Sequence, residues 1–294
     1  MLTPLPYPQL LTYLLEGRAR PTATRFVADA EAPILYSGAV AVESAPQTQT
    51  MDLVDSTGMS AIDELAFARV LLDSVKSGRR GPTLRLYRPA PTLAFGARDR
   101  FLPGFPAAVE AARAHGFTPA LRSLGGRAAA YHPGSLVIDH IEPSDSFITD
   151  TTKRFSSFGA DYAQVLRSLG VDAHLGEIPG EYCPGEYSVN VAGRIKAIGT
   201  AQRVVSGAWL FSSSVVVTDP DPIRAVLTDV EAALGVDWDP ATGGAISEIH
   251  PEITVDAVAE AFAAYYGRAH TLTPSSPTPE ELTTLPEQAA KHVL

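Results

Sequence analysis

The chain has 294 residues, of which 45% are hydrophobic, and its formal net charge is −10 at pH 7. This is enough apolar material for one large core with a small appendage. The negative charge argues against general nucleic-acid binding, because phosphate affinity comes mostly from clustered Lys and Arg. The sequence contains no long apolar run and only one cysteine, and its first residues lack the charged-then-apolar order of a signal peptide. We therefore expect a cytoplasmic protein with no membrane partner and no internal disulfide.

The first clear element is a helix that follows residue 60. Residues 1–50 contain scattered prolines and no sustained hydrophobic period, so they are predicted to form an N-terminal extension. Ser60 followed by Asp63 resembles a capping box. Apolar residues then recur at steps of three and four, which predicts an amphipathic helix that ends near Gly78.

Basic residues gather just after this helix. The stretch from Arg79 to Arg100 holds six arginines and a single acid, Asp99. A local basic face on an acidic protein suits an acidic partner or an anionic ligand. A solvated arginine-rich rim explains the same pattern equally well.

A glycine bend interrupts the short segments that follow. The pair Gly125 and Gly126 permits positive φ, lets the backbone approach a ligand, and exposes N–H groups that bind anions. A plain hairpin turn would use the same residues. His132, in the next turn, either caps backbone carbonyls or takes part in catalysis. The predicted elements here are strands at Leu84–Tyr87, Thr92–Phe95, Ala128–Tyr131 and Leu136–Ile141, and a helix at Pro106–His115.

An antiparallel meander is predicted over residues 185–217, after a helix at Thr151–Leu169 and a strand at Val171–Leu175. Its first turn is Ala192-Gly193. Lys196 lies inside the apolar second run, although only four of the 23 basic residues are lysines. A compact ammonium suits one carbonyl or phosphate oxygen. The alternative is a half-buried lysine that snorkels to the surface.

The C-terminal part carries further helices and a polar tail. Helices are predicted at Pro222–Leu234 and Val255–Tyr266. Residues 272–294 are rich in Ser, Thr and Pro, so we expect a loosely ordered tail there, after a helical segment over 241–271. The sequence shows no Cys/His metal spacing. Because strands arrive as hairpins between 84 and 217, the predicted class is α+β, with a mostly antiparallel mixed sheet and flanking helices.

Three segments in this order resemble the biotin/lipoate protein ligase superfamily, in its lipoate ligase and octanoyltransferase branch. They are AIDELAF (61–67), RSLGGRAAAYH (122–132) and NVAGRIKAIGTAQR (190–203). The resemblance covers roughly residues 50–235 and implies a catalytic domain over 51–240. It also implies that a glycine loop wraps the acyl chain and that a strand lysine holds the reacting oxygen. By position, the lysine is Lys196, and the acyl- or cofactor-binding residues are Arg122, Gly125, Gly126, Arg127, His132 and Gly199.

Cys183 is a candidate nucleophile. It lies in the Pro/Gly-flanked loop GEYCPG, thirteen residues before Lys196. In the octanoyltransferases that this branch resembles, a cysteine in this neighbourhood takes the acyl group from a thioester. A neighbouring ammonium favours the reactive thiolate, so Lys196 would activate Cys183. The alternative is that Cys183 is a small buried hydrophobe.

The resemblance leaves the activation of the acyl group open. Arg127 stands where ATP-using ligases tend to carry a third glycine, which favours Cys-mediated transfer without a cofactor. The alternative is an ATP- and Mg-dependent lipoate ligase that forms an acyl-adenylate. A non-catalytic module that binds lipoate or a lipoyl domain is a further alternative, and a biotin ligase is a weaker one.

The resemblance also implies the substrates. The acyl group would be octanoate or lipoate. The acceptors would be lipoyl domains of 2-oxoacid dehydrogenase E2 subunits or the glycine-cleavage H protein, and an acyl carrier protein is a possible donor.

Overall fold

A computed structural model describes residues 49–145 and 151–294, so most of the predicted extension over 1–50 lies outside the described residues. The fold is built on an eight-stranded sheet with the order β11-β1-β2-β6-β10-β9-β8-β7. Within this eight-stranded sheet, only the pairs that β1 makes with β2 and β11 are parallel. The predicted α+β class is thus confirmed. The strands are β1 (Gln49–Val54), β2 (Thr83–Tyr87), β6 (Ser135–Ser144), β7 (Ala173–Leu175), β8 (Val189–Val191), β9 (Ile195–Val205), β10 (Gly207–Val216) and β11 (His270–Ser275).

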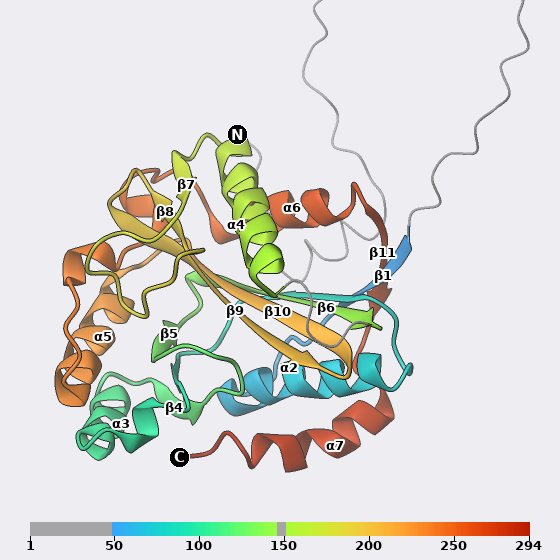
Figure 1. Cartoon of the computed structure of the whole chain (residues 1–294), viewed down its shortest axis with the longest axis horizontal. Coiled ribbons are helices and arrows are strands. Elements are labelled where there is room, and N and C mark those ends of the chain that lie inside the picture. Colours follow the sequence, from blue (N-terminus) through green and yellow to red (C-terminus); the bar gives the residue numbers. More distant parts are fainter. Residues whose placement is uncertain (1–48, 146–150) are drawn as a thin grey trace, which may run out of the picture.

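Helices cover both faces of this sheet, and a small second sheet lies at one end (Figure 1). In that view α4 and α6 lie above the large sheet and α2 and α7 lie below it. The small sheet has the order β4-β3-β5, and α3 and α5 pack beside it. These elements are β3 (Thr92–Phe95), β4 (Thr118–Leu121), β5 (Ala129–Tyr131), α2 (Ala61–Lys76), α3 (Phe105–Ala114), α4 (Thr151–Ser168), α5 (Asp221–Leu234), α6 (Val255–Tyr266) and α7 (Pro279–Ala289), with short 3-10 turns at Asp99–Phe101, Pro240–Thr242 and Ile246–Glu248.

The hydrophobic core has three parts that follow these layers. One lies between the large sheet and α4 and α6, one between the sheet and α2, and one around the small sheet with α3 and α5. Burial of these apolar faces is the main favourable term that holds the layers together. The largest fully buried aromatic side chains in them are Tyr162, Phe211 and Phe262 above the sheet, Phe67 below it, and Phe95 in the small sheet.

The predicted helix start at residue 60 is confirmed. Ser60 is extended at the N-cap of α2, and its hydroxyl accepts a hydrogen bond from the Asp63 N–H at 3.2 Å. After the helix ends, Gly78 adopts φ +73°, a conformation that favours glycine. The apolar stripe of α2 is buried against the sheet, with Phe67, Leu71 and Leu72 each completely covered.

The predicted meander is confirmed as β8, β9 and β10. Ala192 and Gly193 both adopt positive φ, +55° and +64°, as a tight hairpin turn with the twist of its strands requires. β9 runs from Ile195 to Val205, so it continues well past the apolar run around Lys196 from which it was predicted. The added residues include Gln202 and Arg203, whose polar character obscures the strand pattern in the sequence.

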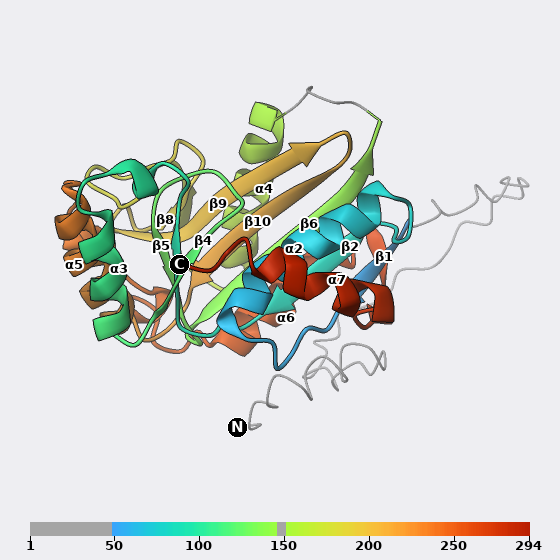
Figure 2. The same cartoon turned by 90° about the horizontal axis from the view of Figure 1, so that it is seen from below.

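The prediction of a loosely ordered tail over 272–294 is wrong. β11 pairs in parallel with β1 along its whole length, and α7 packs beside α2 (Figure 2). The Ser, Thr and Pro residues that indicated disorder instead cap and begin α7. Thr278 and Glu281 form a capping box, and Pro279 occupies the first turn.

The predicted basic face over Arg79–Arg100 is largely neutralised. Arg85 is completely buried and paired with Asp139 at 2.6 Å. Arg80 is also buried and contacts both Glu281 and Asp52. The carboxylates that neutralise these arginines come from distant parts of the chain, so the local sequence contained no sign of them.

The ion pair between Arg80 and Glu281 ties α7 to the start of β2, and it supports a stability prediction. Both side chains are at most 4% exposed, and the guanidinium contacts the two carboxylate oxygens at 2.6 and 2.7 Å. Glu281→Ala leaves a buried guanidinium without its main partner. We expect the free energy of unfolding to fall by about 3 kcal/mol in urea titrations. The matched control is Glu280→Ala, which removes an exposed pair with Arg79 and should cost less than about 1 kcal/mol. Equal effects of the two substitutions would contradict the prediction.

Candidate active site

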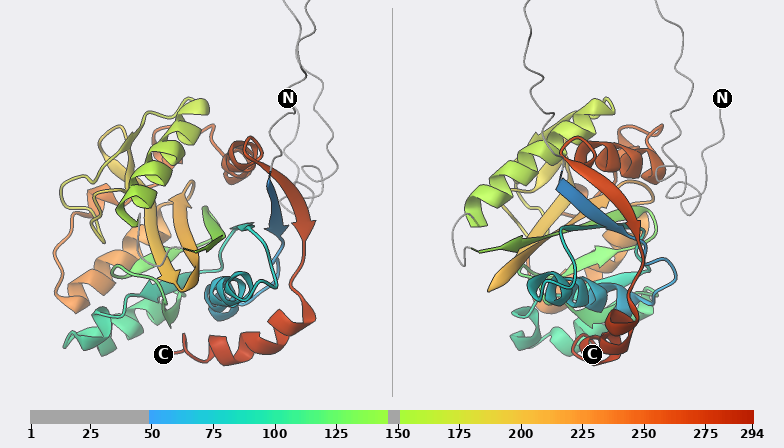
Figure 3. Two further views of the ribbon diagram at one scale, coloured as in Figure 1. Left: turned by 45° about the vertical axis from the view of Figure 1, so that its right-hand side comes forward. Right: turned by 90° about the vertical axis from the view of Figure 1, so that its right-hand side faces the viewer.

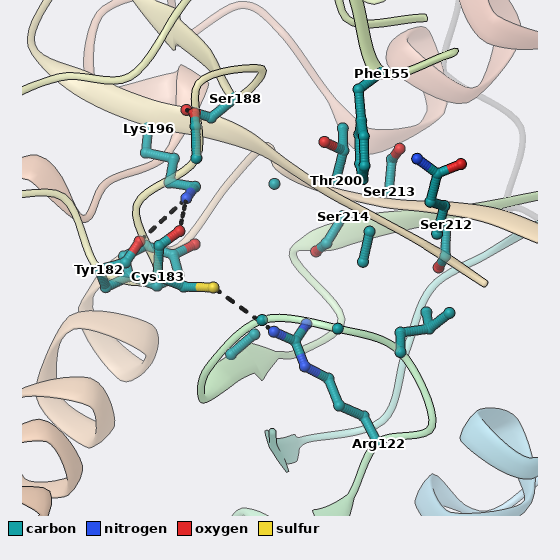
Figure 4. Close-up of a pocket in the computed structure, with 18 of the residues that line it drawn as sticks. Arg122, Phe155, Tyr182, Cys183, Ser188, Lys196, Thr200, Ser212, Ser213 and Ser214 are labelled. Carbon is teal, nitrogen blue, oxygen red and sulfur yellow. Dashed lines mark hydrogen bonds between the residues drawn. The ribbon is translucent and has the colours of Figure 1, made fainter. Parts of the chain in front are cut away.

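A cavity of about 430 Å³ lies between the segments that carry the sequence motifs (Figure 4). The bend between β4 and β5 forms one wall, β9 and β10 form another, and the β7–β8 loop closes one end. Phe155 of α4 lies across the cavity from Cys183 and Lys196. Every predicted site residue lines this cavity except Arg127 and His132. The main lining residues are Arg122, Leu124, Gly125, Gly126, Tyr131, Val137, Phe155, Tyr182, Cys183, Lys196, Gly199 and Ser214.

Lys196 is buried at the closed end of the cavity, and its ammonium makes three hydrogen bonds. It donates to Glu181 Oε1 at 2.9 Å, to the Tyr182 carbonyl at 3.1 Å and to the Cys183 carbonyl at 2.7 Å. Only 3% of the residue is exposed, so the snorkelling alternative is excluded. Because an ammonium has three N–H bonds, all of its donors are directed at one short loop. Lys196 therefore holds that loop against β9.

Glu181 is the buried counter-charge of Lys196. Its carboxylate also accepts hydrogen bonds from the Ser188 hydroxyl at 2.9 Å and from the backbone N–H groups of Ile178 and Gly185. A buried carboxylate is tolerated only when its oxygens are paired in this way. The pair thus connects the whole β7–β8 loop to the lysine.

Cys183 has an unusual backbone conformation at the edge of the cavity. Its φ is +42°, which non-glycine residues rarely adopt and which persists only where the surroundings enforce it. The sulfur accepts a hydrogen bond from the Arg127 backbone N–H at 3.2 Å and contacts Arg122 Nη2 at 3.6 Å. Both donors stabilise negative charge on sulfur, which is the reactive form of a cysteine.

The polar neighbours of the sulfur differ from those we expected. Lys196 was expected to activate the Cys183 thiol, but its ammonium contacts Cys183 only through the backbone oxygen. The guanidinium next to the sulfur belongs to Arg122. Burial lowers the pKa of Arg122, but Tyr131 and Cys183 raise it, and the net shift is upward. Arg122 therefore remains a cation at the cavity wall.

The diglycine bend brings Arg122 and Cys183 together. Gly126 adopts φ +96°, and a Cβ built there would lie 2.2 Å from Arg122 Nη2 and 3.0 Å from the Cys183 sulfur. Glycine is thus required at this position for two reasons, backbone conformation and space. Gly125 faces open space, with no heavy atom within 4 Å of a built Cβ.

The structure places His132 and the Arg127 side chain away from the cavity, which corrects their prediction as acyl-binding groups. The His132 ring lies 2.6 Å from the Asp219 carbonyl and 3.2 Å from the Ser135 hydroxyl, so it holds the turn before β6. The Arg127 guanidinium lies behind the bend, 3.5 Å from Asp99. Only the backbone N–H of Arg127 reaches the site.

Two buried acids lie with Arg127 behind the bend. Asp99 is completely buried, and its second oxygen accepts a hydrogen bond from the Gly96 N–H. Glu231 of α5 is 1% exposed, and neither of its oxygens has a hydrogen-bond partner among the described residues. Burial, and then the charge of Asp99, raise the pKa of Glu231 to about 7.

A family comparison agrees with this arrangement. Residues 60–267 match the model of the lipoyl protein ligase A/B catalytic domain. The chain belongs to this family. The match contains the glycine bend, Cys183 and Lys196, and it confirms the resemblance found in the sequence. It ends before β11 and α7.

Two relatives of known name are similar to about half of the chain. The chain is 31% identical to octanoyl-[GcvH]:protein N-octanoyltransferase of Geobacillus kaustophilus over 155 residues, which cover 53% of each chain. It is 30% identical to the enzyme of that name from Exiguobacterium sibiricum, over 55% of this chain and 56% of the relative. The chain thus spans about half the length of these relatives.

The fold agrees with solved lipoate ligases. A bi-partite lipoate protein ligase of Thermoplasma acidophilum superposes with a TM-score of 0.65 at 22% identity, over 83% of this chain and 93% of the other. A lipoate-protein ligase A bound with ATP superposes with the same TM-score at 21% identity, over 83% and 95%. These similarities show the fold.

Sequence reasoning missed several residues of the lipoyl ligase domain site. Glu181 is the most important, and a signal for it was available, because a lysine buried in a strand requires a nearby carboxylate and Glu181 stands two residues before Cys183. Phe155 carried no such signal. It reaches the cavity only through the packing of α4 on the sheet.

The two glycines of the bend provide a matched test. Gly126→Ala introduces strain at φ +96° and displaces Arg122 from the sulfur, so we expect about 1–3 kcal/mol lower stability and slower alkylation of Cys183 at neutral pH. Gly125→Ala should change the free energy of unfolding by no more than about 0.5 kcal/mol, and it should change the alkylation rate by no more than about twofold. Because the chain has a single cysteine, iodoacetamide labelling followed by intact mass measures the reaction directly. Faster or unchanged alkylation of Gly126→Ala would refute this account of the bend.

Glu231 predicts a specific pH dependence of stability. Its folded pKa of about 7 lies above the ordinary value of 4.5, so the neutral form stabilises the fold below pH 4.5. That contribution is lost as the pH rises through 7. The difference amounts to about 3 kcal/mol. Glu231→Gln should therefore unfold at higher urea concentration than the parent at pH 8 but not at pH 4.5. The exposed Glu110→Gln is the control, and parallel pH curves for the parent and Glu231→Gln would contradict the prediction.

Proposed function

We propose that this protein transfers an octanoyl or lipoyl group to a lysine of a lipoyl domain through a thioester on Cys183. The observation that carries the proposal is the placement of the Cys183 sulfur. It lies at one end of an acyl-sized cavity, on a strained backbone, between the Arg127 N–H and the Arg122 guanidinium. A structural cysteine would need none of these features.

The cavity supports a two-step reaction. In the first step the Cys183 thiol loses its proton and its sulfur attacks the acyl carbonyl of the donor. The new C–S bond forms, the bond from the acyl carbon to the sulfur or lysine nitrogen of the donor breaks, and that donor atom takes up the proton that the thiol released. In the second step the amine of the acceptor lysine attacks the thioester, the C–N bond forms, and the C–S bond breaks to regenerate the thiol. The acyl chain lies along the apolar part of the cavity, which includes Val137 and Phe155. The cations Arg122 and Lys196 lie at its polar end, where negative charge develops on the acyl oxygen.

Lys196 has a positioning role in this proposal. Its ammonium already donates to three oxygens of residues 181–183. It therefore stabilises the strained loop that presents Cys183, and its charge lies near the carbonyl end of the acyl group. To contact the acyl oxygen directly, it would exchange one of these hydrogen bonds.

The substrates are proposed from the names of the relatives. Those names couple octanoyl-GcvH to a protein acceptor. We propose the same octanoyl chemistry here, with lipoyl domains of E2 subunits or the glycine-cleavage H protein as partners and an acyl carrier protein as an alternative donor. Among the described residues, no helix is long and apolar enough to cross a bilayer. A cytoplasmic location stays a prediction.

Intact-mass measurement tests the thioester. The full chain is incubated with octanoyl-GcvH or octanoyl-carrier protein, without ATP. We expect an adduct of about 126 Da, one octanoyl group on one nucleophile. The adduct should be absent from Cys183→Ser and should disappear when an acceptor lipoyl domain is added.

Further arms separate the alternatives. Acceptor acylation by Cys183→Ser that depends on ATP and Mg would replace the transferase with a ligase. Binding of lipoate or of the lipoyl domain, with no acylation under either condition, would identify a non-catalytic module. Adduct formation that persists in Cys183→Ser would place the nucleophile elsewhere.

A further inference from the structure

A second cavity, of about 310 Å³, lies beside the acyl cavity and is lined mostly by basic side chains. Arg122 lines both cavities. The other walls come from α2, from the far end of β9 and from the C-terminal segment. The lining residues are Arg69, Leu121, Arg122, Ser123, Arg203, Gln288, Lys291 and His292, with no carboxylate among them.

The positive charge of this cavity is poorly compensated. Arg69 pairs with Asp73 at 3.0 Å, and the more exposed Lys291 pairs with Glu287 at 3.1 Å. Within residues 49–145 and 151–294, no ion pair joins Arg122 or Arg203 to a carboxylate. Burial lowers the pKa of Arg203, and so does the nearby charge of Arg69, while Asp73 raises it. Guanidinium groups gathered in this way repel one another unless an anion lies among them.

Each of the three arginines also leaves a buried N–H group without a partner. Within the described part of the chain, these groups are Nη1 of Arg69, Nε of Arg122 and Nε of Arg203. The arginine heads are nevertheless held in place. Arg203 Nη1 donates to the Ser123 carbonyl at 2.7 Å, and Arg69 Nε donates to Asp73 at 3.1 Å. Arginine heads that are fixed around one cavity, with no carboxylate in its lining, are the features of an anion site.

The C-terminal segment completes the cavity. The His292 carbonyl accepts a hydrogen bond from the Leu121 N–H at 2.9 Å, and the His292 ring contacts the Leu121 carbonyl at 2.6 Å. These contacts place Lys291 and Gln288 over the arginines, with α7 running beside α2 (Figure 3). This wall lies beyond residues 60–267, which match the family model. The three arginines lie within the matched range, so the cavity joins the family domain to the C-terminal segment.

We propose that this second cavity binds a phosphate group. The guanidinium groups come from three separate elements: α2, the start of the bend after β4, and β9. Such an arrangement surrounds a tetrahedral anion with several oxygens better than it fits a flat carboxylate with two. The phosphate is either free inorganic phosphate or part of a larger ligand that extends past Arg122 toward the acyl cavity. Binding does not require the acyl transfer proposed above.

Calorimetric titration of the full chain tests the site. Inorganic phosphate is titrated at constant ionic strength, with sodium chloride and acetate as reference anions. We expect phosphate to bind at least about tenfold more tightly than acetate, and Arg203→Gln to weaken phosphate binding by at least about tenfold. Arg194→Gln, an exposed arginine on the β8–β9 turn, is the matched control and should change binding less than twofold.

Thermal unfolding separates binding from folding. Without phosphate, Arg203→Gln should melt at the same temperature as the parent or higher, because it relieves repulsion with Arg69. Phosphate should raise the melting temperature of the parent and of Arg194→Gln but not of Arg203→Gln.

Titration with ATP and with coenzyme A identifies the source of the phosphate. If one of them binds more tightly than inorganic phosphate, and if Arg203→Gln abolishes that gain, the site binds the phosphate of a larger ligand. If neither binds more tightly than inorganic phosphate, the site binds the free anion.

Three outcomes would overturn the proposal. They are acetate binding as tightly as phosphate, equal phosphate binding by the parent and Arg203→Gln, and equal losses in Arg203→Gln and Arg194→Gln. None of these measurements uses an acyl donor. Failure here therefore leaves the proposed transferase untouched, and failure of the transferase leaves the phosphate site untouched.

Discussion

The arrangement of the active site depends on one buried ion pair, between Lys196 and Glu181. A lysine in the interior of a sheet is costly unless a carboxylate and further acceptors take up its charge. Here the remaining two N–H bonds go to the carbonyls of Tyr182 and Cys183, so three successive residues are fixed to β9 by one ammonium. This attachment explains how Cys183 keeps φ +42°, a conformation that a free loop would relax. The ion pair therefore fixes the position of the sulfur, because it attaches the loop to a rigid strand.

The glycine bend acts on the same sulfur from the opposite side. Gly126 has no side chain between Arg122 and Cys183, and the next backbone N–H, that of Arg127, donates to the sulfur. The bend also packs directly on Gly96, so closely that a Cβ there would lie 2.0 Å from the Gly126 carbonyl. Two sequence motifs that are far apart in the chain thus form one unit, and neither is complete without the other. A motif search finds each motif separately, but the chemistry comes from their contact.

Local sequence patterns predicted most of the fold, but they could not predict ion pairs between residues that are far apart in the chain. The α2 cap, the Ala192-Gly193 turn and the cavity-lining glycines all follow from rules that act within a few residues. The C-terminal segment was mistaken for a tail because its stability comes from β1 and from Arg80, about 200 residues earlier in the chain. Glu181 was missed for a related reason, since its significance depends on where the Lys196 side chain ends. His132 was assigned by position in a motif, yet its ring is used to hold a turn.

The arginines show why charge must be judged in three dimensions. The conspicuous run over Arg79–Arg100 contains side chains that are largely neutralised in the fold, among them Arg80 and Arg85. The poorly compensated charge instead comes from Arg122 and Arg203, which lie beside the paired Arg69. The three arginines are far apart in the sequence and converge only when α2, the bend and β9 pack together. Of these, Arg122 lies between the two cavities and contacts the sulfur. An anion in the second cavity and negative charge on the sulfur would therefore share one guanidinium. Each would weaken the electrostatic stabilisation of the other, because the positive charge that both require is the same.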